Sequence, residues 1–233
     1  MSEHSQILHV GFVLFPALTQ LDLTGPWEVF TRIPYVHCHL LSDDLAPVRS
    51  ASGGLSIVPT LPYAECGQLD IVIVPGGPGH LEAMQDERLL SFLRGQEPGC
   101  QFVIAVCTGS LILAAAGLLE GYDCTTHWTA LHRLPAYGAR PVNRRVVFDR
   151  KRVTGGGVTA GIDLGLAVAA TLAGEDAARR IQLQMEYAPE PPFGGSPEAA
   201  DIATVNALRH PPPAIAKAIK DIDEAAIARL AKM

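Results

Sequence analysis

Apolar runs of about strand length alternate with helical patterns over the first part of the chain. Four runs are almost wholly apolar: ILHVGFVLF (7–15), YVHCHLLS (35–42), DIVIVPGG (70–77) and QFVIAVC (101–107). Strands that are buried on both faces of a parallel sheet have this character. Because helical patterns begin at Gly25, Glu87 and Thr108, the order predicts βαβ units in a doubly wound, mostly parallel sheet with helices on both faces.

Two segments depart from this alternation, and the C-terminal part follows a different pattern. Residues 48–61 and 144–157 are predicted to be glycine-containing hairpins, the second turning at 149–151. Residues 159–174 are apolar almost all round, which predicts a core helix with Thr159 as its cap, followed by an amphipathic helix.

Prolines then exclude regular structure between 189 and 199, and helical patterns resume at Ala199 and Pro213. No internal repeat and no second core are evident. We therefore expect one domain over 1–233, with its core at about 5–188 and a proline-rich link with C-terminal helices over 189–233.

Composition narrows the class of protein. The 233 residues are 48% hydrophobic and 18% charged, which is typical of a compact globular chain. A net charge of -6 without a dense Lys/Arg cluster argues against a nucleic-acid partner. The N-terminus lacks a signal-peptide layout and no apolar run reaches membrane-spanning length, so we expect a cytoplasmic protein without a membrane partner.

The five cysteines are an odd number without a CxxC pair, which is a poor framework for disulfides or zinc. His37, Cys38 and His39 form a candidate ligand cluster. In a strand, however, His37 and His39 share one face while Cys38 points to the other. The tetrahedral geometry of a zinc site is then hard to satisfy, and we expect no bound metal.

The end of the fourth apolar run is the main candidate for chemistry. Cys107 stands where a buried strand meets a helix, at the sheet edge where doubly wound folds bind ligands. With Gly109 close behind, the layout is that of a nucleophile elbow. A helix N-terminus beside the sulfur favours the thiolate. A buried core cysteine is the alternative, but the position favours a reactive thiol.

Two other segments reach the same edge of the sheet. VPGGPG (74–79) allows backbone N–H groups to approach a ligand as an oxyanion hole, or is an ordinary βα turn. In QLDLTGP (20–26), Pro26 suits the first helical position, with Thr24 or Gly25 near the cap. That assignment leaves Asp22 outside the helix, either as a structural cap or as a general acid/base facing the thiol.

Two further segments supply pocket candidates. In TTHW (125–128), His127 and Trp128 are such candidates, although a lone histidine is more often structural. GGGVTAG (155–161) contains a loose GxGxxA pattern, but it comes late and no acidic residue follows at the spacing of dinucleotide sites. We therefore expect that no cofactor binds here. Instead, we expect a backbone turn at Gly157, with Val158 lining the pocket. Asp163 is expected to be a buried structural carboxylate.

Together these motifs resemble the DJ-1/PfpI superfamily of ThiJ and glutamine amidotransferase-like proteins, which has the PGG loop, cysteine elbow, TTHW segment and TGGG turn in this order. Within it, LDLTGP, VCTGSLIL, TTHW, GGGVTAGID and QLQMEYAPEPPF resemble the bacterial isocyanide hydratases over nearly the whole chain. The resemblance implies a flavodoxin-like α/β sandwich and a homodimer. It also implies Cys107 as nucleophile, Asp22 as acid/base, and Gly77, Thr108 and Val158 at the pocket.

One departure from the wider superfamily is informative. Its protease-like branch has a histidine directly after the cysteine, whereas this chain has Thr108, so peptidase chemistry lacks its expected base. The hydratases often have isoleucine where Val158 stands, a change that could widen the pocket slightly.

The activity implied by the resemblance is that of a hydro-lyase. It would add water to a small uncharged isocyanide, through a covalent thioimidate on Cys107, to give an N-substituted formamide. Asp22 would handle the protons, and N–H groups near Gly77 and Thr108 would hold developing charge. One alternative is a non-catalytic sensor like the N-terminal domains of AraC-type regulators, although the C-terminal tail is short for the DNA-binding unit of such regulators. The other alternative is a different thiol enzyme, such as a glyoxalase or hydrolase.

Overall fold

A seven-stranded sheet forms the centre of the protein in the computed structural model, which describes residues 7–232. All neighbouring strands pair in parallel except β10, which is antiparallel to β11 at one edge. In spatial order the strands are β10 (Val146–Asp149), β11 (Arg152–Gly155), β7 (Phe102–Val106), β6 (Ile71–Val74), β1 (Leu8–Val13), β2 (Val36–Ser42) and β5 (Leu61–Pro62). This confirms the predicted doubly wound, mostly parallel sheet.

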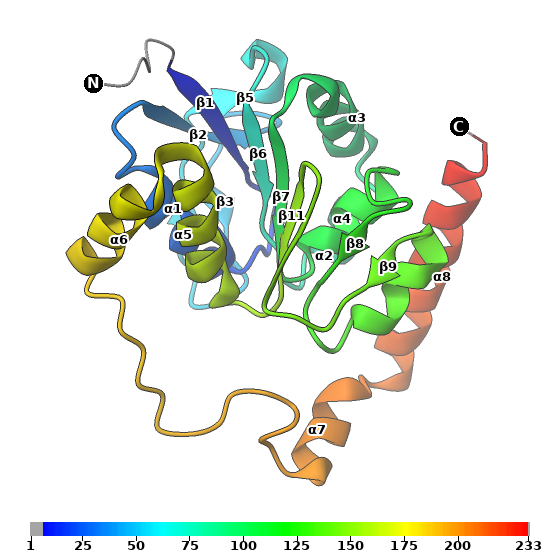
Figure 1. The fold of residues 1–233 in the computed structure, drawn as a ribbon. Helices are drawn as coiled ribbons and strands as arrows, with labels where there is room; N and C mark the ends of the chain where they lie inside the picture. The colour runs from blue at the N-terminus through cyan, green and yellow to red at the C-terminus, as the bar shows by residue number, and fades with distance from the viewer. Residues whose placement is uncertain (1–6, 233) are drawn as a thin grey trace.

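Helices cover both faces of the sheet (Figure 1). One layer consists of α1 (Gln20–Phe30), α5 (Ala160–Ala173) and α6 (Glu175–Gln184). The other consists of α2 (His80–Ala83), α3 (Glu87–Gln96) and α4 (Gly109–Ala115), with α8 (Pro213–Leu230) packed outside α4. The remaining helix is α7 (Ile202–Arg209), and short 3-10 turns occupy η1 (Tyr63–Glu65), η2 (Glu97–Gly99) and η3 (Leu131–Tyr137).

Both predicted hairpins are present. β3 (Val48–Arg49) pairs with β4 (Ser56–Ile57), and β10 pairs with β11 around the turn at Arg150 and Lys151. A short parallel pair that the sequence did not predict joins β8 (Asp123–Cys124) to β9 (Arg140–Pro141).

The continuous apolar runs have the burial expected of central strands. Phe12, Ile73 and Ile104, on the three adjacent strands β1, β6 and β7, are 0% exposed. Ala226 of α8 belongs to the same core cluster as these strands. The carboxyl ends of the six parallel strands therefore all point to one edge of a well-packed sheet.

The start of α1 differs from the prediction. The helix begins at Gln20 with Thr19 at the N-cap, so Asp22 lies in its first turn and Pro26 lies inside the helix. A first turn forms ahead of the proline because the Asp22 N–H donates to the Thr19 carbonyl at 3.0 Å. Packing against α5 then holds the helix, since a Cβ on Gly161 would lie 2.8 Å from Pro26 Cδ. Tertiary contact outweighs the local preference for proline at a helix start.

The start of α5 also differs. Thr159 is at the N-cap, but its side chain does not cap the helix, because Thr159 Oγ1 accepts a hydrogen bond from Arg145 at 3.2 Å. Asp163 is half-buried rather than buried, and its carboxylate pairs with the same arginine at 2.5 Å. Its structural role therefore agrees with the expectation.

The C-terminal part agrees with the prediction. Residues 189–199 contain no helix or strand, and α7 begins at Ile202 with Asp201 as its cap, its carboxylate accepting from the Thr204 N–H at 2.8 Å. None of the described helices is long and apolar enough to cross a membrane.

Candidate active site

The carboxyl ends of four strands bring the predicted chemistry together. Cys107 and Thr108 follow β7, Gly76 and Gly77 follow β6, and Asp22 comes from the helix after β1. β11 ends beside β7, so that the Cys107 N–H donates to the Gly155 carbonyl at 3.0 Å.

Cys107 has the backbone conformation of an elbow. Its φ of 56 is in the left-handed region, which a residue with a side chain adopts only where its surroundings hold it. Thr126 supplies one such restraint, because Thr126 Oγ1 donates to the Cys107 carbonyl at 2.8 Å. Gly109 supplies another, since a Cβ there would lie 2.2 Å from the Val74 carbonyl oxygen. The predicted elbow is therefore present.

The PGG loop is bonded to the elbow and to Asp22. The Gly77 N–H donates to Thr108 Oγ1 at 2.9 Å, and the Gly76 N–H donates to Asp22 Oδ2 at 2.9 Å. Neither N–H is free in this arrangement. The oxyanion role of Gly77 remains a prediction, and it requires the bond to Thr108 to be shared or exchanged.

Asp22 is a fully buried carboxyl group beside the thiol. Its side chain is 0% exposed, and Oδ1 has no hydrogen bond partner of normal geometry among the described residues. Burial raises the pKa of Asp22 to about 7, although the Gly76 N–H and the Cys107 thiol favour the charged form. The group can therefore both accept and release a proton near neutral pH.

The thiol differs from the sequence-based expectation of a stabilised thiolate. Burial and the negative charge of Asp22 raise the pKa of Cys107 above its ordinary value, and the Thr108 N–H and hydroxyl only partly offset this. The first four residues of a helix do present free N–H groups, but Cys107 is only 5% exposed, and desolvation of the thiolate outweighs their effect. Cys107 is consequently a thiol beside a basic carboxylate at neutral pH.

The remaining predicted pocket residues lie on the segments around the elbow. His127 is half-buried and its Nδ1 bonds Thr129 Oγ1 at 2.7 Å, while burial lowers the pKa of His127. The Arg209 guanidinium lies 5.6 Å from the Trp128 ring centroid. Val158 and Gly157 are half-buried at the start of α5. Their roles at the site remain predictions.

Several buried polar residues that support the elbow escaped the sequence analysis. Besides Thr126, Ser110 Oγ donates to the Thr125 carbonyl at 2.7 Å, and the Thr125 N–H donates to Thr154 Oγ1 at 2.8 Å. All four side chains are at most 2% exposed. Two of these residues, Thr125 and Thr126, are the first two letters of TTHW, so the sequence did contain a signal for them.

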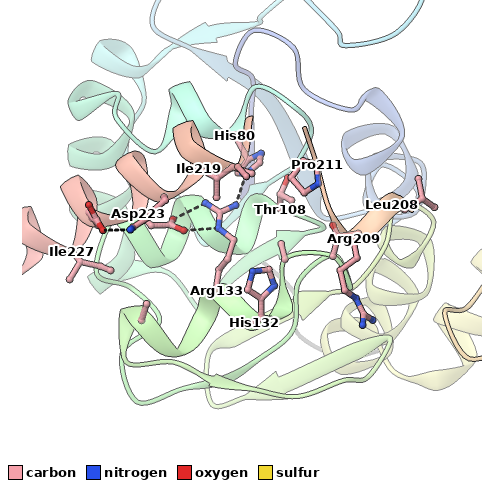
Figure 2. A pocket seen from close by; sticks show the side chains of 16 residues that line it. His80, Thr108, His132, Arg133, Leu208, Arg209, Pro211, Ile219, Asp223 and Ile227 are labelled. Carbon is pink, nitrogen blue, oxygen red and sulfur yellow. Dashed lines mark hydrogen bonds and ion pairs between the residues drawn. The ribbon is translucent and has the colours of Figure 1, made fainter. Parts of the chain in front are cut away.

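An apolar pocket opens beside Thr108 (Figure 2), with a volume of about 580 Å³. Its walls come from η3, from the segment between α7 and α8, and from α8, and they include Ala130, Leu208, Ile219 and Ile227. Such a cavity suits a small uncharged group. His127, Trp128, Gly157 and Val158 do not line it.

A buried polar chain starts at α8 and passes through Arg133 to His80 (Figure 2), which bonds the PGG loop. Asp223 on α8 accepts two hydrogen bonds from Arg133, at 2.7 and 2.9 Å, and the Arg133 guanidinium lies 3.0 Å from His80 Nε2. His80 Nδ1 is 2.8 Å from the Gly77 carbonyl oxygen. Burial and the Arg133 charge lower the pKa of His80 to about 4, so the neutral ring accepts from Arg133 and donates to Gly77.

Comparison with known proteins adds a family context to this geometry. The model of the DJ-1/PfpI family matches residues 9–171. The chain is 48% identical over 224 residues to the isonitrile hydratase of Pseudomonas putida, which covers 96% of this chain and 98% of that protein. It is also 35% identical over 165 residues to the HTH-type transcriptional regulator GbdR of Pseudomonas aeruginosa, covering 67% of this chain and 44% of the regulator.

A solved structure confirms the flavodoxin-like sandwich that the resemblance implied. A THiJ/PfpI family protein from Pseudomonas syringae superimposes with a TM-score of 0.88 at 38% identity, covering 94% of this chain and 90% of that one.

Proposed function

Because the chain belongs to the DJ-1/PfpI family, we propose that it is an isocyanide hydratase, a hydro-lyase that converts R–N≡C and water into an N-substituted formamide. The observation that carries this proposal is the buried pair of Asp22 and Cys107, with a threonine where a histidine base would stand. A full-length relative that is 48% identical and named isonitrile hydratase supports it. We further propose that it acts in the cytoplasm, where a free thiol stays reduced.

The first half of the reaction adds the S–H bond of Cys107 across the terminal isocyanide carbon. Asp22 takes the thiol proton as the C–S bond forms and delivers it to the same carbon, which gives the thioimidate Cys–S–CH=N–R. No net proton is gained or lost in this step. A carboxyl group with a pKa of about 7 is matched to both transfers.

The second half hydrolyses the thioimidate. Asp22 removes a proton from water as the oxygen attacks the thioimidate carbon and passes it to the nitrogen, which gives the adduct Cys–S–CH(OH)–NH–R. As the C–S bond breaks and the C=O bond forms, the hydroxyl proton passes through Asp22 to the Cys107 sulfur, and R–NH–CHO is released. The Thr108 N–H, which bonds the sulfur, stabilises it as it leaves.

The pocket beside Thr108 supports an uncharged substrate. We propose that the R group of the isocyanide extends from the elbow into this cavity, where Leu208, Ile219 and Ile227 offer apolar contacts beside the polar side chains of its walls. Its volume of about 580 Å³ exceeds the need of a short alkyl chain, so isocyanides of graded size test the assignment.

A second function, ligand sensing without catalysis, is favoured by the match to the regulator GbdR over 67% of this chain. A measurement of isocyanide turnover distinguishes the hydratase from the sensor. Purified protein should convert alkyl isocyanides of increasing size to formamides, and folded Cys107→Ala and Asp22→Asn variants should not. Binding of isocyanide without any formamide from the intact protein would favour the sensor.

A further inference from the structure

Three histidines cluster on one face of the sheet, far from the elbow. β1 and β2 are paired in parallel with His9 opposite His37 and Gly11 opposite His39. The alternation of side chains therefore puts all three imidazoles on one side. They lie toward the amino ends of the two strands, whereas Cys107 follows the carboxyl end of β7. The cluster is thus separate from the site described above.

The nitrogens of these rings converge. One ring nitrogen from each histidine lies within 4.8 Å of the other two, and His9 Nδ1 is 3.0 Å from His39 Nε2. The rings of His37 and His39 are stacked with centroids 4.6 Å apart. Two nitrogens that each bind a zinc ion at 2.0–2.1 Å are separated by roughly 3.3 Å at a tetrahedral angle. The observed spacing is therefore close to that of a ligand set.

The surroundings favour ligand binding over simple stacking. His9 and His37 are exposed and His39 is half-buried, so an ion can reach the nitrogens from solvent. A hydrogen bond of 2.7 Å from the His9 N–H to Asp70 Oδ2 fixes the His9 backbone.

We propose that His9, His37 and His39 form a binding site for a divalent first-row transition ion such as Zn²⁺, with water completing its coordination. Imidazole nitrogens select such ions over Mg²⁺ and Ca²⁺, which take oxygen ligands. The bound ion would cross-link β1 and β2, because its ligands come from both strands. A cavity of about 210 Å³ lined by His9, His39 and Gln68 lies alongside and leaves room for the water.

The sequence pattern alone did not reveal this site. His37 and His39 were expected to share a face, and their stacking confirms it. The third ligand, His9, is 28 residues from His37 along the chain and reaches it only through the parallel pairing of β1 and β2.

The test is calorimetric titration of the untagged, chelator-treated full chain with Zn²⁺. A Cys107→Ala background removes metal binding by the reactive thiol. One ion per chain is expected, with binding weakened by at least about tenfold in His9→Gln and in His37→Gln, and unchanged in His210→Gln, an exposed histidine outside the cluster. Zn²⁺ should also raise the thermal unfolding midpoint of the parent and not that of the two cluster variants.

Each contrary result is distinguishable. Equal Zn²⁺ affinity in the parent and both cluster variants would overturn the site, as would the absence of binding by the parent. Half an ion per chain would indicate a site shared between two copies and would overturn the intrachain assignment. Melting without metal shows whether the variants fold. None of these outcomes depends on hydratase activity.

Discussion

Asp22 and Cys107 keep their usual order of acid strength, because burial raises the pKa of both groups and the carboxyl group remains the stronger acid. Desolvation raises the pKa of both groups, but only Asp22 is left close to neutrality, at about 7. The resting pair near neutral pH is therefore a thiol beside a carboxyl group that is partly ionised. In that state the Cys107 thiolate forms only when the Asp22 carboxylate accepts the thiol proton. Thiolate formation is therefore coupled to the arrival of an electrophile.

The pH dependence of the reaction follows from this pairing. If Asp22 must be ionised to accept the thiol proton, kcat/KM should rise with pH through about 7 and then level off. Asp22→Asn should lower kcat/KM by roughly 10²–10⁴-fold and should remove the rise of kcat/KM with pH, the ascending limb of the profile. Initial rates of formamide formation from pH 5 to about 9 provide the measurement. A limb retained in Asp22→Asn would assign the titration to another group.

The same carboxyl group should lower the stability of the fold. Because its folded pKa of about 7 lies above the ordinary 3.8, the folded state binds more protons between these values, and stability falls as pH rises through them. Asn keeps an oxygen for the Gly76 N–H but carries no charge. Asp22→Asn should therefore be more stable than the parent above pH 7, by at most roughly 4 kcal/mol.

Urea unfolding across a pH series checks this prediction. The gap between Asp22→Asn and the parent should be small near pH 4, widen toward pH 7 and then stay constant. A gap that does not vary with pH would mean that the charge of Asp22 is not the cause.

Thr126 tests whether the elbow conformation matters for the rate. Thr126→Val leaves the Cys107 carbonyl without its 2.8 Å hydrogen bond, at a cost of about 1–3 kcal/mol of stability. As a positioning residue, it should affect kcat, by about tenfold, more than KM. Thr126→Ser restores the hydroxyl and should recover the rate. A full rate in Thr126→Val together with a loss in Thr126→Ser would point to packing of the methyl group instead.

At the scale of elements, α8 is tied to the PGG loop by charge as well as by packing. The side chains of Arg133 and Asp223 are 5% and 16% exposed, and His80 connects them to Gly77. The helix that closes the apolar pocket therefore also supports the loop that holds Asp22 and Thr108. A change in α8 can reach the chemistry without touching it.

Asp223→Ala should be strongly destabilising because it leaves the buried Arg133 guanidinium without its carboxylate. We expect a loss of about 3 kcal/mol in urea unfolding, together with a lower kcat. Asp221→Ala is a matched control on the same helix, since Asp221 pairs with Lys217 on the exposed side. It should leave the unfolding midpoint almost unchanged. Similar losses in the two variants would show that the buried pair is not the cause, since alanine raises helix propensity at both positions.

At the scale of the whole molecule, the fold could be predicted from the sequence and the details of the site could not. Continuous apolar runs identify buried parallel strands, and Cys107 follows one of them, so the elbow was predictable. The start of α1 was not, because contact with Gly161 holds Pro26 inside the helix. The protonation of Cys107 was also missed, since desolvation depends on residues from four strands and no local pattern records it.

The exposed apolar side chains argue that the chain does not act alone. Leu183 on α6, Phe193 in the link and Ile202 at the start of α7 are 81%, 83% and 72% exposed. Single exposed apolar residues are ordinary, but side chains this open are also found where a partner covers the surface. The link that carries Phe193 has no regular structure of its own, so contact with a second copy would order it.

We therefore expect a homodimer with twice the 24.8 kDa mass of the chain, in which this segment is covered. Light scattering after size exclusion, repeated over a dilution series, gives the mass. Leu183→Asp combined with Phe193→Asp should shift the population to monomer. Leu45→Asp, at a position 55% exposed in the loop after β2, should not. A monomeric parent would exclude the dimer, and a dimer that survives the double substitution would place its interface on another face.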